Sequence, residues 1–235
     1  MPRYFWPVGA MLGTQIAGAA TLSTVPVLAP EIAAELGVDT SLVGIYTGIV
    51  FVASTLILTT SGWLIERLGA VRVNQLAVVC SGAALLLVLV PFLPVIALAA
   101  VLVGLGYGPN TPASSQVLSQ VVTPRRRALA FSIKQSGAPI GGVLAGLLLP
   151  FLVVVTDWRV ALTVFAGFAF LAAIVVQPLR RRLDDAPRHW TSKSVSPGAA
   201  MRVVLKDSKL RNLKIFKEKI PQRENEIFFS PALMS

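Results

Sequence analysis

Charged residues are scarce in this chain of 235 residues: they make up 14% of the sequence, against about 25% in an ordinary soluble domain. Cysteine and histidine are scarcer still, with Cys80 and His189 as single examples. One cysteine excludes a disulfide framework, and the two residues together cannot supply a metal-ligand set. No histidine lies in an apolar segment to act as a general base. We therefore predict no catalytic residue, no metal site and no cofactor, and a protein that is not an enzyme.

Long apolar segments fill most of the chain, of which 54% is hydrophobic. A helix needs about 20 apolar residues to cross the hydrocarbon core of a bilayer. The charge-free intervals predict six transmembrane helices, because a proline-containing turn at residues 91–94 divides the longest interval in two. The expected spans lie near residues 5–29, 41–65, 73–91, 95–120, 129–153 and 159–178. The sequence therefore predicts an all-α integral membrane protein with a six-helix bundle over residues 1–178.

Positive charge is concentrated after the last span: residues 1–178 hold 8 of the 21 lysines and arginines, and 13 follow. Such residues gather on the cytoplasmic flanks of membrane proteins, so the net charge of +10 indicates topology rather than nucleic-acid binding. All but one of the loop arginines fall on one side of the predicted bundle, and the other side has Glu31, Glu35, Asp39, Asp157 and only Arg159. We expect a multi-pass protein of the plasma (inner) membrane with both termini cytoplasmic.

The connection between the second and third spans carries the sharpest local pattern. It contains Gly62, Glu66, Arg67, Gly69 and Arg72. The pattern resembles the loop signature of the major facilitator superfamily, Gly-x-x-x-Asp-Arg-x-Gly followed by basic residues, with Glu66 in place of the usual Asp. A glycine at position 69 permits a short turn, and an acid at position 66 is available to pair with cations or cap a helix. We expect this loop to take part in conformational change.

The fifth span supplies a second match to the same superfamily, a helix rich in glycine and proline. Its members are Gly137, Pro139, Gly141, Gly142 and Gly146. Two Gly-x-x-x-Gly pairs predict close helix packing in lipid. Ala138 stands where many proton-coupled drug antiporters of the superfamily have glycine, which disfavours an antiporter but leaves that alternative open.

The resemblance implies a fold and a mechanism. It implies the amino-terminal half of a twelve-helix carrier, built from two inverted three-helix repeats. It also implies secondary-active transport of a small organic solute by alternating access. The expected partners are the lipid bilayer, the solute and a missing carboxy-terminal six-helix half. A membrane fragment that does not transport, or a partner-binding subunit, is the alternative from another class.

Polar side chains inside the spans are the candidate solute contacts, because an unpaired polar group in hydrocarbon costs several kcal/mol. In the fourth span Asn110, Thr111, Ser114 and Ser115 fall on one side of a helix. Gln15 in the first span is the other candidate. Hydrogen bonding between helices by these same side chains is the competing interpretation.

Lys134 is the one basic residue within a predicted span, and no Asp or Glu lies within those spans to pair with it. Its ammonium could reach cytoplasmic water by extending along the helix. Alternatively, an anionic solute supplies the missing partner, since a lysine at the bilayer centre costs roughly 2.5–3.5 kcal/mol. This residue favours an organic anion as the solute.

The end of the chain departs from the preceding pattern. Residues 179–212 are typical of a basic cytoplasmic loop that leads toward a seventh helix. The segment 213–235 is instead polar, lacks Gly and Val, and is rich in Lys, Glu, Ile and Phe. We expect a frameshift or a junction with foreign sequence and hence a truncated carrier, with a short amphipathic helix on the inner leaflet as the alternative.

Overall fold

The computed structural model describes residues 5–184, apart from the side chains at positions 181 and 182. Every regular element in this range is a helix. The helices are α1 (Phe5–Val27), α2 (Ala29–Leu36), α3 (Leu42–Leu68), α4 (Ala70–Val88), α5 (Leu93–Val121), α6 (Pro124–Gln135), α7 (Gly137–Val155) and α8 (Trp158–Leu183). The predicted loop over 179–212 lies outside the described residues beyond position 184, and the predicted tail over 213–235 lies outside them entirely.

Six helical segments are long and apolar enough to cross a membrane, which confirms the predicted all-α membrane fold. They are α1, α3, α4, α5, α8 up to Arg180, and a 32-residue segment that α6 and α7 form together. Their bounds differ from the expected spans by a few residues at most ends. The largest differences arise where a helix continues past the apolar stretch, because hydropathy marks the membrane and not the helix end.

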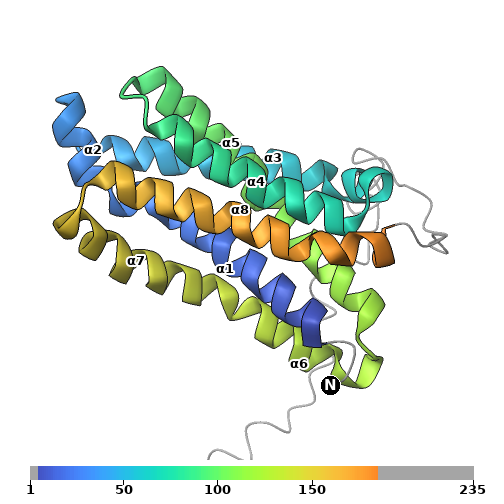
Figure 1. Cartoon of the computed structure of the whole chain (residues 1–235). Coiled ribbons are helices and arrows are strands. Elements are labelled where there is room, and N and C mark those ends of the chain that lie inside the picture. Colours follow the sequence, from blue (N-terminus) through green and yellow to red (C-terminus); the bar gives the residue numbers. More distant parts are fainter. Residues whose placement is uncertain (1–4, 185–235) are drawn as a thin grey trace, which may run out of the picture. The chain divides into compact units, whose positions relative to one another are not determined.

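The helices pack in two layers (Figure 1). The first layer runs in the order α3, α5, α1, α7, with α6 against α1 and α5. The second layer consists of α4 and α8, which pack on each other, α4 also on α5 and α8 also on α1. As a result α1 and α5 lie at the centre of the bundle, and α3 and α7 lie at the edges of the first layer.

The short helix α2 was not predicted, because the sequence beyond residue 29 looked like a loop. It exists because Pro30 occupies its first turn, where a missing N–H costs nothing, and Glu31 lies beside the positive helix end. Gly37 ends it in the left-handed conformation, at φ 63°. Leu28 separates α1 from α2 at the point where Pro26 and Pro30 interrupt regular helix geometry.

The fifth transmembrane segment begins at Pro124, five residues before the expected residue 129. Proline fits the first helical turn, and the three arginines that follow are good helix formers. Arg127 also donates to the backbone oxygens of Ser119 and Val122, at 2.8 and 3.2 Å. It therefore satisfies carbonyls at the end of α5 and fixes the short connection to α6.

Large apolar side chains remain exposed on the two edge helices of the first layer. Examples are Leu56 on α3, 66% exposed, and Leu147 on α7, 69% exposed. A surface of this kind is stable only against lipid or another apolar surface.

Candidate functional site

Lys134 lies near the end of α6 and is 1% exposed. Its ammonium donates to the backbone oxygen of Thr111 at 3.3 Å and to the hydroxyl oxygen of Ser115 at 3.4 Å. Both acceptors are on α5 and are neutral. Among the described residues Lys134 forms no ion pair. A cation inside the first layer is thus solvated by two weak acceptors without a compensating carboxylate.

A break in the fifth segment places Lys134 at this position. Pro139 has no N–H, and its ring conflicts with the carbonyl of Gln135 four residues earlier. The helix accordingly divides at Ser136, between α6 and α7. Lys134 is therefore in the last turn of α6, next to the interruption.

Two of the predicted packing glycines lie where α7 meets α1. A Cβ at Gly137 would lie 3.0 Å from the Cβ of Gln15, and one at Gly141 would lie 2.4 Å from the backbone oxygen of Ile16. A Cβ at Gly142 would reach only the Ser23 hydroxyl at 4.0 Å, and one at Gly146 would meet nothing within 4 Å. The first glycine pair is therefore at a helix contact, whereas Gly146 makes none among the described residues.

The predicted polar stripe of α5 divides into two parts. Asn110 and Ser114 are buried, and Asn110 donates to the backbone oxygen of Thr14 at 3.2 Å. Thr111 is exposed and Ser115 is half-buried, and these are the two residues that contact Lys134. The structure thus joins Lys134 to Thr111 and Ser115, and turns Asn110 and Ser114 toward the interior.

Asn110 is at the centre of a small polar network inside the bundle. Its side-chain oxygen accepts from the Asn74 amide of α4 at 2.6 Å. The Ser114 hydroxyl donates to the backbone oxygen of Asn110 at 2.7 Å. This network joins α1, α4 and α5, as hydrogen bonds between membrane helices do.

Gln15 is also buried, at 1% exposed, on α1. Among residues 5–184 its side-chain oxygen has no hydrogen-bond partner. A buried acceptor without a donor is uncommon in folded proteins. Gln15 lies against Gly137, three residues after Lys134 in the chain.

The predicted loop motif sits at the end of the bundle where α3 turns into α4. Glu66 and Arg67 are in the last turn of α3, and the Arg67 guanidinium stacks 4.3 Å from the centre of the Trp63 ring. Gly69 adopts φ 95°, a conformation that favours glycine. A Cβ at Gly62 would meet nothing within 4 Å.

The carboxylate that caps α4 is Asp184 at the end of α8, which the sequence had not singled out. It accepts from the backbone N–H groups of Val71 and Arg72 at 3.1 and 2.9 Å. A Cβ at Gly69 would collide with this carboxylate, so only glycine leaves room for the cap. Position 184 was overlooked because it is 113 residues from Val71 and follows the last apolar segment.

An ion-paired cluster lies at the other end of the bundle. Glu35 of α2 accepts from the indole N–H of Trp158 at 3.0 Å and forms an ion pair with Arg159. Asp157 is 3.6 Å from the Arg159 guanidinium. The unpredicted helix α2 is therefore fastened to the start of α8.

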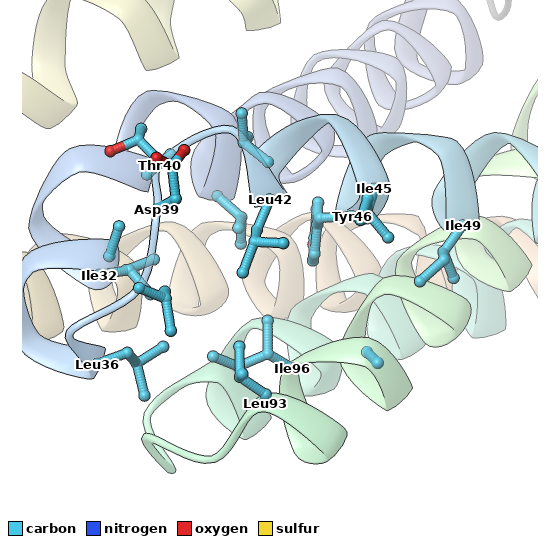
Figure 2. Close-up of a pocket in the computed structure, with 16 residues that line it drawn as sticks. Ile32, Leu36, Asp39, Thr40, Leu42, Ile45, Tyr46, Ile49, Leu93 and Ile96 are labelled. Atoms are coloured by element: carbon cyan, nitrogen blue, oxygen red, sulfur yellow. The ribbon is translucent and has the colours of Figure 1, made fainter.

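An apolar groove of about 240 Å³ lies between α2, α3 and α5 (Figure 2). Aliphatic side chains line most of it, and the polar side chains of its lining are Asp39, Thr40 and Tyr46. Hydrogen bonds from the Ser41 side chain and backbone N–H hold the pKa of Asp39 below its ordinary value. The groove offers few polar groups to orient a polar solute, so we do not assign the solute site to it.

The described residues contain no group of three or more His, Cys, Asp or Glu side chains placed to hold a metal ion. Beyond Asp184, the sequence reasoning also missed Asn74 and Gln75 of α4. The sequence did contain a signal for them, because both are polar residues inside a predicted span. The same criterion selected Gln15.

Known structures share this arrangement of helices. Two solved structures of similar fold are a peptide transporter, POT, in complex with sulfate, and a mutant form of it in complex with sulfate. Each is 17% identical in sequence, with TM-scores of 0.64 and 0.63 respectively. The alignments cover 95% of this chain and 47% of those chains, so this chain spans about half their length. No curated protein is similar enough to be matched.

The family profile of the Major Facilitator Superfamily matches residues 10–229, which includes most of the segment 213–235. The match covers the six transmembrane helices, the loop motif and the Gly/Pro-rich fifth segment. Taken with the two-layer bundle, it identifies the fold and the class of protein. The chain belongs to the Major Facilitator Superfamily and is a multi-pass membrane protein.

Proposed function

We propose that this six-helix bundle is one half of a secondary-active carrier for a small organic anion. The observation that carries the proposal is the buried Lys134 ammonium, whose two hydrogen-bond acceptors are neutral. Removing a lysine charge from water costs roughly 2.5–3.5 kcal/mol in a membrane helix. An anionic group of the solute offsets that cost when it binds, which gives the carrier selectivity for charge.

A solute reaches Lys134 beside Thr111 and Ser115, whose backbone oxygen and hydroxyl oxygen, respectively, accept from the ammonium. The exposed Thr111 and the half-buried Ser115 are next to the ammonium, on α5 of the first layer. A carboxylate that displaces the long bond between Lys134 and Ser115 gains a charge-assisted hydrogen bond in return. The Ser115 hydroxyl is then available to donate to the same solute.

The remaining candidates take different roles in this proposal. Gln15 is a further solute contact, because its side-chain oxygen is an acceptor without a donor. Asn110 and Ser114 are positioning residues, since their hydrogen bonds lie inside the bundle and Asn110 is 1% exposed. They hold the register of α5, on which Thr111 and Ser115 are placed.

The carrier mechanism requires a second bundle. Alternating access moves one six-helix half against the other around a central site. The helices α3 and α7 lie at the edges of the first layer. Their exposed apolar side chains provide a surface for such a second bundle. The POT structures of similar fold are about twice as long as this chain, which supports a two-bundle carrier.

The charged residues at the two ends of the bundle indicate its orientation in the membrane. Arg67, Arg72 and Arg125 lie at one end, whereas Glu35 and Asp157 lie at the other. By the positive-inside rule the arginine-bearing end faces the cytoplasm, so both termini are cytoplasmic in a plasma membrane. The Gly69 turn and its Asp184 cap then form the cytoplasmic joint at which α3, α4 and α8 move as one body.

Equilibrium binding of radiolabelled probes to the purified chain in nanodiscs tests this proposal. The anionic probes are succinate and lactate, and glycerol is the uncharged control. We expect saturable binding of at least one anion, weakened by added sulfate, and no binding of glycerol. Equal retention of glycerol and both anions would contradict an anion site.

A further inference from the structure

A groove of about 350 Å³ runs between α4 and α8, the two helices of the second layer. Its walls are Leu76, Val79, Phe170, Ala173 and Ile174. Ile174 is 68% exposed, so the groove opens on the outside of the bundle. It is distinct from the Lys134 site, whose partners are on α5 of the first layer.

One end of this groove is polar and basic. Arg72 lies in the first turn of α4, and Gln177 lies one turn before the arginine run that begins at Arg180. Among the described residues Arg72 forms no ion pair, since the Asp184 carboxylate accepts from its backbone N–H and not from its guanidinium. The groove therefore combines apolar walls with a guanidinium that forms no ion pair within the described part of the chain.

Gln75 gives the polar end a fixed geometry. It is 5% exposed, and its amide donates to the backbone oxygen of Ala173 at 3.0 Å and to the side-chain oxygen of Gln177 at 2.6 Å. Because the Gln177 oxygen is held in this way, its NH₂ group is the part left to donate elsewhere. Gln177 is exposed in the groove.

We propose that this groove binds an anionic phospholipid, with the phosphate on Arg72 and Gln177 and an acyl chain along the apolar walls. Guanidinium and amide N–H groups are suitable phosphate donors, and basic pockets between membrane helices on the cytoplasmic side hold anionic headgroups. The acyl chain follows the exposed side chains of Leu76, Val79 and Ile174. Gln75 is a positioning residue that orients Gln177.

Native mass spectrometry of the purified chain with equal amounts of phosphatidylglycerol and phosphatidylcholine tests the site. We expect phosphatidylglycerol to be retained preferentially. Arg72→Ala should lower the ratio of retained phosphatidylglycerol to phosphatidylcholine about fivefold, the factor for one arginine near an anionic surface. Gln177→Leu should lower the same ratio and keeps the test decisive if Arg72→Ala folds poorly.

Two variants outside the groove serve as matched controls. Arg125→Ala removes an exposed arginine, and Gln120→Leu an exposed glutamine, at the same end of the bundle. Both variants should still retain phosphatidylglycerol in preference to phosphatidylcholine. Equal retention of the two lipids, or an equal loss in Arg125→Ala, would overturn the proposal, because diffuse positive charge would then explain the binding. The proposal would also be overturned if soluble glycerol 3-phosphate competed as strongly as the phospholipid itself. The acyl chain would then contribute nothing to binding.

Discussion

Asn74 and Asn110 are joined across α4 and α5 by a hydrogen bond of 2.6 Å that lies inside the bundle. Asn110 also donates to the backbone of Thr14 on α1. One side chain of α5 therefore links the two layers and the two central helices. This network holds α5, which carries the Thr111 and Ser115 contacts of Lys134, against α1 and α4.

The Asn74–Asn110 pair should contribute measurably to stability. In a double-mutant cycle with Asn74→Ala and Asn110→Ala, we expect a coupling of about 0.6–1.7 kcal/mol, as for other hydrogen bonds between membrane helices. Unfolding in mixed micelles provides the free energies. Thr111→Ala is the control, because only the Thr111 backbone contacts Lys134, and it should not couple to Asn74. Additive effects of the two asparagine variants would contradict the network.

Gly18 should be intolerant of a larger side chain. A Cβ at this position would lie 2.6 Å from the amide nitrogen of Asn110, so Gly18→Ala forces that amide out of its hydrogen bonds. We expect a loss of about 1–3 kcal/mol in the free energy of unfolding, typical of overpacking.

Gly13→Ala on the same helix is the matched control. A Cβ there meets nothing within 4 Å, so its stability should be unchanged or slightly raised. An equal loss in both variants would mean that glycine at position 18 serves helix flexibility rather than the fit to Asn110.

Asp184 should stabilise the start of α4. Asp184→Ala removes the acceptor for the N–H groups of Val71 and Arg72 and should cost about 0.5–2 kcal/mol, as for other helix caps. Hydrogen exchange should become faster at those two amides. Asp184→Asn keeps an acceptor oxygen, so its stability should lie between that of Asp184→Ala and that of the natural chain.

The control for this cap is Asp157→Ala at the opposite end, where Asp157 accepts from the Arg159 N–H at 3.4 Å. It should leave exchange at Val71 and Arg72 unchanged. Unchanged exchange there in Asp184→Ala would show that the cap contributes nothing.

Reporter fusions should establish the proposed topology. Fusions after residues 36, 70, 93, 125, 157 and 185 should alternate between outside and inside, starting outside, because each pair is separated by one transmembrane segment. Alkaline phosphatase and green fluorescent protein report the two sides. Two neighbouring fusions on the same side would contradict the six-span topology, and a first fusion on the inside would contradict the orientation.

The six-helix fold was predictable because each span is a long apolar interval, and this signal is local. The helix α2 was less apparent, since its signals are a proline, a glutamate and a final glycine rather than hydropathy. The division of the α5 stripe was also not predictable. A helical wheel places Asn110 and Thr111 only 100° apart, and it does not say which neighbouring helix covers each of them.

At the candidate site, too, the sequence indicates a residue but not the residues that contact it. Lys134 stood out because a charged residue in an apolar span is conspicuous. Its contacts with Thr111 and Ser115 depend on the break at Ser136 and on the packing of α6 against α5. The Asp184 cap joins residues more than a hundred positions apart, so only the tertiary structure reveals it.

The central claim is that Lys134 is the charge that receives an anion. Succinate binding to the chain in nanodiscs, measured by equilibrium dialysis for the natural sequence, Lys134→Met and Lys134→Arg, tests it most directly. Methionine keeps an unbranched side chain without the charge, whereas arginine keeps the charge. We predict at least about tenfold weaker binding for Lys134→Met, the loss of one charged hydrogen bond, and substantial recovery for Lys134→Arg. Equal affinity in Lys134→Met and the natural chain, with both variants inserted and folded, would contradict the account.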